Sequence, residues 1–167
     1  MKVIVSDTSV IVDLCKVQLI EPAFALPYEF VIPNVMFEDE FLDLGNYERE
    51  DLLTSGLTVS VLSGEAVGMA VEYGSAFKRL SINDQFALAL AKTTEESILL
   101  TGDMALRNAA TSQSVEVRGL LWLCDQMEEH RTIAAKMLRE ALIALDEDEF
   151  VRLPRNELRK RISRLIG

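Results

Sequence analysis

The sequence predicts an α/β fold in which a central, mostly parallel sheet is flanked by helices in three layers. Short unbroken apolar runs at Val3–Val5 and Ile98–Leu100 are typical of strands buried on both faces of a parallel sheet. Residues 30–32 and 115–117 resemble weaker strands of the same kind. Helical patterns alternate with these runs, and that alternation is typical of a sheet covered by helices.

Apolar residues at helical spacing predict the helices between these strands. The expected ranges are 34–44, 65–78, 82–93, 104–109, and 120–145 with a possible break. The segment 57–62 alternates with period two, so it could be a further strand, and the pattern leaves that open.

The length of 167 residues fits one domain of ordinary size. We expect residues 1–145 to form this domain and residues 146–167 to form a charged C-terminal extension that is helical. The extension begins with the acidic run 146–149, and six basic residues follow it: Arg152, Arg155, Arg159, Lys160, Arg161 and Arg164. The opposite charges could pair with each other, bind separate partners, or form a solvated terminal helix.

The composition excludes several classes of protein. Hydrophobic residues make up 49% of the chain, which predicts a well-packed globule. The net charge of −10 excludes a broad basic face, so a nucleic-acid ligand would need positive charge from another source. Cys15 and Cys124 lie in apolar surroundings and are expected to be buried and free. The chain lacks a signal-peptide pattern and an apolar run of ~18 residues, which predicts a cytoplasmic protein without membrane spans.

The single histidine, His130, is flanked by charged residues and is expected to face solvent. A Ser-His-Asp or Cys-His nucleophile and a His-rich zinc site therefore lack the necessary residues. The glycine-rich motifs that cradle nucleotide phosphates are absent as well. Carboxylates remain as the candidate chemical groups.

The placement of these carboxylates predicts that they converge. Asp7 and Asp103 each follow a predicted strand closely, and the carboxyl ends of parallel strands meet at one edge of a sheet. Asp84 opens the helix 82–93, and the acidic run 38–40 lies shortly after Pro33.

Helix capping is the alternative interpretation of each carboxylate. Asp7 and Asp103 could be N-caps, and Ser81 to Asp84 fits a capping box. Capping does not explain why four acidic positions share an edge, whereas a divalent-metal site does. Mg²⁺ and Mn²⁺ prefer oxygen ligands, polarise phosphate and activate water. An acidic pocket can accept a polyanion through such ions, and the basic residues nearest in sequence are Lys78, Arg79, Lys92 and Arg107.

Five motifs occur in an order that resembles the acidic motifs of PIN-domain nucleases. They are Val3–Ser9, Ile32-Pro33 before the acidic run 38–40, Leu80–Asp84 with Ala87, Ala89 and Ala91, Leu99–Arg107, and Val117–Leu121. The resemblance covers roughly residues 1–125 and implies an α/β PIN-like domain.

The resemblance assigns the first, third and fourth carboxylates of the family to Asp7, Asp84 and Asp103. It also assigns the hydroxyl positions that hold the metal-binding carboxylates, or a water on the metal, to Thr8, Ser9 and Thr101. The second carboxylate stays open among three adjacent residues: Glu38, Asp39 and Glu40. Helical geometry favours Glu40, because Phe37, Phe41 and Leu44 place a buried stripe on its side.

These assignments imply an endoribonuclease that depends on Mg²⁺ or Mn²⁺. Small members of the family are commonly VapC-type toxins, which implies a homodimer and an antitoxin whose Arg or Lys reaches the acidic cluster. Apolar positions expected to be exposed support such interfaces: Phe37, Phe41, Leu44, Trp122, Met127 and Met137. The alternatives are a DNA or flap nuclease, a catalytically silent scaffold that binds a protein, and a phosphatase with Asp7 as nucleophile. The phosphatase needs a positioned Lys or Arg, which the sequence does not provide.

Overall fold

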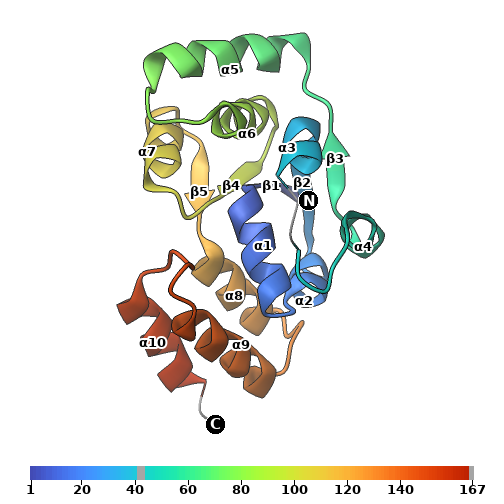
Figure 1. Cartoon of the computed structure of the whole chain (residues 1–167), viewed down its shortest axis with the longest axis vertical. Helices are drawn as coiled ribbons and strands as arrows, with labels where there is room; N and C mark the ends of the chain where they lie inside the picture. The colour runs from blue at the N-terminus through green and yellow to red at the C-terminus, as the bar shows by residue number, and fades with distance from the viewer. Residues whose placement is uncertain (41–43, 166–167) are drawn as a thin grey trace.

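The computed structural model describes residues 1–40 and 44–165. Within these residues the sheet has five parallel strands in the order β3-β2-β1-β4-β5 (Figure 1). The strands are β1 (Lys2–Ser6), β2 (Tyr28–Pro33), β3 (Thr58–Ser60), β4 (Ser97–Leu100) and β5 (Glu116–Arg118). The predicted α/β fold is confirmed, and the alternating segment 57–62 contributes β3.

The central strands owe their position to apolar side chains on both faces. In β1, Val5 pairs in register with Val31 of β2 and Leu99 of β4, and all three are buried. Figure 1 shows α5 (Gly64–Ala76) and α6 (Ile82–Thr93) on one side of the sheet. On the other side lie α1 (Thr8–Lys16) and α8 (Leu120–Glu129). The sheet is therefore covered by helices on both faces, which gives the three layers.

The remaining helices correct the sequence-based boundaries. They are α2 (Ile20–Phe24), α3 (Asn34–Asp39), α4 (Arg49–Ser55), α7 (Met104–Ser112), α9 (Ala135–Glu147) and α10 (Arg155–Arg164). The helix expected over 34–44 ends at Asp39, and residues 41–43 lie outside the described residues. The break expected within 120–145 follows α8, whose C-cap is the exposed His130. The short helices α2 and α4 were not expected.

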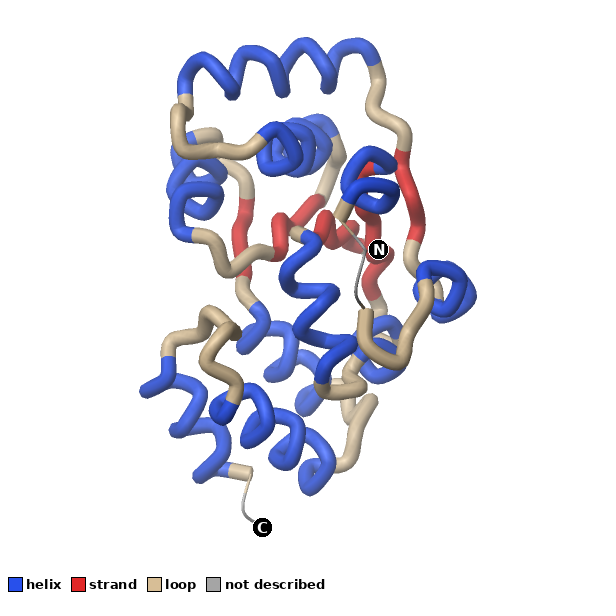
Figure 2. Tube along the Cα trace, in the orientation of Figure 1, coloured by secondary structure: helices blue, strands red, loops and turns tan. Residues whose placement is uncertain are grey.

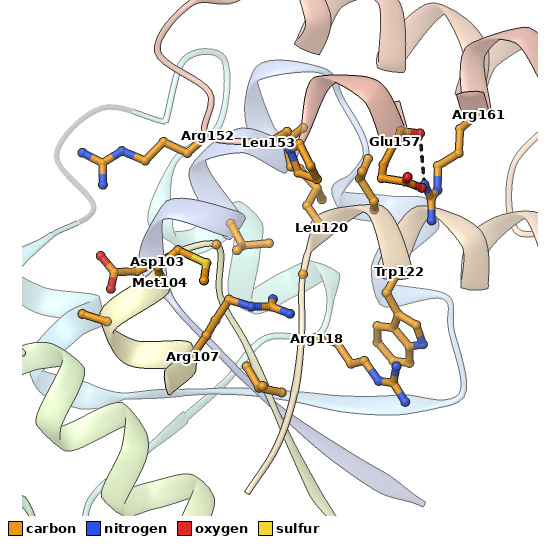
Figure 3. Close-up of a pocket in the computed structure, with 17 residues that line it drawn as sticks. Asp103, Met104, Arg107, Arg118, Leu120, Trp122, Arg152, Leu153, Glu157 and Arg161 are labelled. Carbon is orange, nitrogen blue, oxygen red and sulfur yellow. Dashed lines mark hydrogen bonds and ion pairs between the residues drawn. The ribbon is translucent and has the colours of Figure 1, made fainter. Parts of the chain in front are cut away.

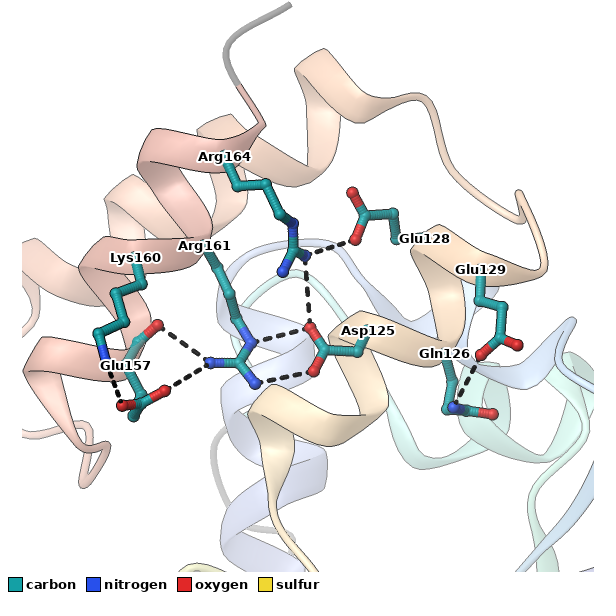
Figure 4. A network of polar contacts seen from close by, with 8 residues as sticks. All are labelled: Asp125, Gln126, Glu128, Glu129, Glu157, Lys160, Arg161 and Arg164. Carbon is teal, nitrogen blue, oxygen red and sulfur yellow. Dashed lines mark hydrogen bonds and ion pairs between the residues drawn. The ribbon is translucent and has the colours of Figure 1, made fainter.

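Ion pairs and apolar contacts hold α10 against the neighbouring helices. The Arg161 guanidinium donates from Nε and Nη2 to the two carboxylate oxygens of Asp125, each at 2.8 Å (Figure 4). Arg164 donates to Glu128, also in α8, and Leu158 is fully buried. Arg155 and Arg159 pair with Asp146 of the acidic run, so basic residues of the C-terminal segment contact both α8 and that run. The division of the chain at residue 145 stays a prediction.

The loop between α9 and α10 approaches the carboxyl end of β4. Figure 2 shows this connection as a loop, and the Arg152 carbonyl lies 3.3 Å from the place a Cβ would take at Gly102. A side chain at residue 102 would therefore require this loop to shift by a few tenths of an ångström. Glycine permits the close approach.

Two further expectations concern the thiols and the membrane. Cys15 and Cys124 are free and buried, and burial raises the pKa of each thiol to about 12. Within the described ranges, no helix is both long enough and apolar enough to cross a membrane.

Candidate active site

Asp7 lies at the carboxyl end of β1, where its backbone caps α1. Its amide donates to the Leu100 carbonyl of β4 at 2.8 Å. Its side chain makes no N-cap hydrogen bond. Instead, Oδ2 accepts hydrogen bonds from Thr101 Oγ1 at 2.8 Å and from Ser9 Oγ at 3.2 Å. Helix capping therefore does not account for the Asp7 carboxylate.

The surroundings of Asp7 are unusual for a carboxylate. Only 8% of the residue is exposed, and this burial raises its pKa, while the Thr101 and Ser9 hydroxyls act in the opposite direction. The negative charge of Glu40 raises the pKa further. The neighbouring Thr8 Oγ1 is buried and has no hydrogen-bond partner among the described residues.

Thr101 connects the ends of the two central strands. Its hydroxyl donates to Asp7 Oδ2 and accepts from the Asp103 amide at 3.1 Å. This uses both roles of one hydroxyl group. The Thr101 carbonyl accepts from Arg107 Nη1 at 3.1 Å. Because Thr101 is fully buried, these contacts fix Asp7 and the start of α7 relative to each other.

Asp103 and Asp84 cap helices, as the alternative interpretation expected. Asp103 Oδ1 accepts from the Leu106 amide of α7 at 2.9 Å. Asp84 Oδ2 accepts from the Ser81 amide at 3.2 Å, and Ser81 Oγ accepts from the Asp84 amide at 3.1 Å. Each capping bond uses one carboxylate oxygen. Asp84 and Asp103 can therefore cap their helices and still keep one carboxylate oxygen that is not used in capping.

The charges of these acids are close enough to affect one another. Burial raises the pKa of Asp84, and the charges of Asp7 and Asp103 raise it further. Several carboxylates therefore share one electrostatic environment at this edge of the sheet.

Glu40 reaches the site by a different route from the expected one. It is the exposed residue directly after α3, and its Oε1 accepts a hydrogen bond from Asn83 Nδ2. The stripe argument fails because α3 ends at Asp39 and does not extend to Leu44. Glu38 and Asp39 are also exposed, but only Glu40 of the three lines the pocket beside Asp7.

This acidic pocket has a volume of about 360 Å³. Its lining consists of Asp7, Ser9, Glu40, Gly102, Asp103, Phe150 and Arg152. Asp84 does not line it and contributes through its charge. Phe150 and Arg152 come from the loop between α9 and α10 and were missed, because the sequence shows only that the tail is basic. Arg152 also corrects the expectation that a cation is lacking near Asp7.

The expected basic neighbours are placed unevenly. Arg107 is part of the site through its bond to the Thr101 carbonyl. Lys92 Nζ donates to the Gln113 carbonyl at 2.7 Å instead, and Lys78 and Arg79 do not line the acidic pocket. In the part of the chain that the structure describes, no three Asp, Glu, His or Cys side chains are close enough together to hold a metal ion.

The protein is thus an α/β protein with a parallel sheet, and its acidic candidate site lies at the carboxyl ends of the strands. The sequence model of the PIN-domain family matches residues 3–166. The chain therefore belongs to the PIN-domain family, whose members are generally nucleases. No curated protein matches the chain at a significant level.

Proposed function

We propose that this protein is a metal-dependent endoribonuclease that hydrolyses RNA phosphodiester bonds. The observation that carries the proposal is the Asp7 carboxylate, buried at a strand end and oriented by two hydroxyls in a pocket with Glu40 and Asp103. Membership of a nuclease family supports this use of the pocket.

The chemistry of the donor set fits a hard divalent cation. Asp7, Glu40 and Asp103 line the acidic pocket and would have to draw closer together to hold Mg²⁺ or Mn²⁺, ions that prefer carboxylate oxygens, while Asp84 would contribute through its charge. The raised pKa values of Asp7 and Asp84 reflect burial together with repulsion from neighbouring carboxylates. A cation would offset this repulsion. When bound, the ion supplies polarisation of the phosphate and activation of a water molecule.

The protein's own side chains orient the ligands and contribute positive charge. Thr101 and Ser9 hold Asp7 in one orientation, and Arg107 fixes the Thr101 backbone. The Arg152 side chain is exposed and lines the acidic pocket. It can therefore offset charge on a bound phosphodiester. A protein nucleophile is not needed in this mechanism.

A cleavage assay with three substrates tests the proposal. End-labelled single-stranded RNA, DNA of the same sequence and a DNA flap are incubated with Mg²⁺, Mn²⁺ or EDTA. We expect internal cuts in RNA only with metal. Equal cleavage in EDTA would contradict metal dependence, and cleavage of DNA or the flap alone would identify the other substrate class.

A silent scaffold is distinguished by binding rather than by activity. Mn²⁺ is titrated into metal-free protein, and the melting temperature is followed. An ion that binds the native state raises the melting temperature by mass action, and Asp7→Asn should remove most of this rise. A melting temperature independent of Mn²⁺ would favour the scaffold.

We also propose the toxin role, a homodimer and an antitoxin, which the family resemblance suggests. Fewer apolar residues are available for such an interface than the sequence suggested, because Leu44 and Met127 are buried in the core. Phe37 and Trp122 are partly buried, Met137 is 60% exposed, and Phe41 lies outside the described residues.

Phe150, which is 80% exposed, lines the acidic pocket, where an antitoxin Arg or Lys would enter. Co-expression with the product of the adjacent reading frame tests the pair: the partner should copurify and suppress cleavage.

A further inference from the structure

A second and larger pocket, of about 880 Å³, adjoins the acidic pocket. The two pockets share Gly102, Asp103 and Arg152. The second pocket lies between the start of α7, the connection from β5 to α8, and the segment 152–154 (Figure 3). We call it the arginine pocket after four lining residues: Arg107, Arg118, Arg152 and Arg161.

The arginines of this pocket are not all neutralised. Arg161 is paired with Asp125 and lies 3.6 Å from Glu157. Arg107 bonds to the neutral Thr101 carbonyl, and Arg118 faces Glu116 at 3.5 Å across an exposed contact. Arg152 has no ion pair or side-chain hydrogen bond with any described residue. Arg107 and Arg152 are therefore the two arginines of this pocket without an acidic partner among the described residues, in a protein of net charge −10.

An aromatic and apolar wall accompanies these charges. The Arg118 guanidinium lies 5.8 Å from the Trp122 ring centroid (Figure 3). Leu120, Leu153 and the exposed Met104 also line the pocket. Arginines that meet phosphates and an aromatic ring that stacks on a base are the combination that binds single-stranded nucleic acid. A duplex keeps its bases stacked inside and would not present them to Trp122.

We propose that the arginine pocket binds the single-stranded RNA segment adjoining the phosphodiester in the acidic pocket. Arg107 and Arg152 bind the flanking phosphates, and one base packs against Trp122 and Arg118. Arg152 belongs to both pockets and marks the point where the strand passes between them. This assignment rests on the proposed ribonuclease function, whose substrate it specifies.

Trp122 is the only tryptophan in the chain, so its fluorescence reports on this pocket directly. A single-stranded RNA 12-mer is titrated in EDTA, which stops metal-dependent cleavage. We expect the RNA to quench the emission. Arg152→Gln and Arg118→Gln should each weaken binding about three- to tenfold. Each lost phosphate contact should reduce the slope of log affinity against log salt by ~0.7.

Lys136→Gln is the matched control, because Lys136 is an exposed cation on α9 that lines neither pocket. It removes the same unit of charge and should leave the affinity and its salt slope unchanged. An equal loss of affinity in all three variants would reduce the effect to overall charge and overturn the proposal. Unchanged melting temperatures of the variants exclude misfolding as the cause.

The outcomes separate this proposal from the ribonuclease proposal. If the protein cleaves RNA in Mg²⁺, but RNA does not quench Trp122 and the arginine variants keep their RNA affinity, the assignment of the arginine pocket is overturned. The ribonuclease proposal is then unaffected. If RNA quenches Trp122 and the arginine variants weaken this quenching, but no metal supports cleavage, the pocket is retained as an RNA site. The proposed ribonuclease activity is then contradicted. Poly-glutamate that quenches as strongly as the RNA would identify an acidic protein segment as the occupant and overturn the proposal.

Discussion

The acidic pocket and the arginine pocket meet at Asp103 and Arg152 but are built differently. The acids of the first lie at strand ends or next to helix ends, where hydrogen bonds from the neighbouring strand end and helix backbone fix them. The second takes its arginines from four separate parts of the chain, which are α7, β5, the loop between α9 and α10, and α10. The difference shows how a strongly acidic protein can keep a local cationic surface next to its carboxylates.

The largest expected effect concerns Asp7. We expect Asp7→Asn to reduce metal-dependent RNA cleavage about a thousandfold, because the loss of one ligand charge weakens metal binding and phosphate polarisation. Asp103→Asn should act similarly while retaining the cap of α7, since Asn is an effective N-cap. Initial rates in Mg²⁺ and circular dichroism measure activity and fold. Wild-type rates in either variant would remove that residue from the site, and loss of folding would favour a structural role.

A smaller effect should distinguish the three adjacent acids. Glu40→Gln should lower cleavage about a hundredfold, equivalent to ~2.7 kcal/mol of transition-state free energy. Glu38→Gln and Asp39→Asn serve as matched controls and should change the rate less than twofold, because neither residue lines the acidic pocket. The comparison is made at saturating metal. Equal and mild losses in all three variants would show that the second carboxylate lies elsewhere.

The bidentate ion pair between Arg161 and Asp125 holds α10 against α8. The loop that precedes α10 lines both pockets. Asp125→Asn should lower the free energy of unfolding by about 2 kcal/mol, because it leaves a partly buried guanidinium with a weaker acceptor. Urea denaturation measures this loss. The double variant with Arg161→Gln should lose less free energy of unfolding than the sum of the losses in the two single variants. Strict additivity would mean that the pair contributes little.

Asp13 provides a contrast with Asp125, because it is a largely buried acid without a close bidentate cation. Burial raises its pKa from 3.8 to about 6, Lys16 at 3.9 Å lowers it, and the charge of Asp148 raises it. The native protein thus binds more protons than the unfolded chain between about pH 4 and 6. The stability associated with this group is present below pH 4 and is lost as the pH rises through 6.

Asp13→Asn should therefore stabilise the protein at pH 7.5 by about 1–2 kcal/mol, with little difference at pH 4. Urea unfolding at the two pH values measures this change. Equal effects at both values would show that packing, rather than ionisation, determines the result. Asp51→Asn, at an exposed capping position, controls for general loss of negative charge.

The parts of the site that depend on local patterns could be predicted from the sequence. Asp7 and Asp103 follow buried apolar strands closely, so the topology of a parallel sheet brings them to one edge. Arg152 could not be predicted, because its place near Gly102 depends on how α9 and α10 pack. Met127 was expected to be exposed, yet it is buried, because an amphipathic pattern does not identify which element covers a face.

Other errors arose from element length. The helices α2 and α4 span 5 and 7 residues, which is too short for a clear periodic pattern. Glu40 was favoured for a helical stripe that the described part of α3 does not contain. Its position beside Asp7 instead comes from the end of α3 and its contact with Asn83.

The outermost strands of the sheet, β3 and β5, span only three residues each. A second chain that added a strand there would gain few backbone hydrogen bonds, and short edges of this kind protect a sheet against uncontrolled pairing. Self-association by continuous sheet formation is therefore disfavoured at both ends. Two copies of this chain would therefore gain little by joining their sheets edge to edge.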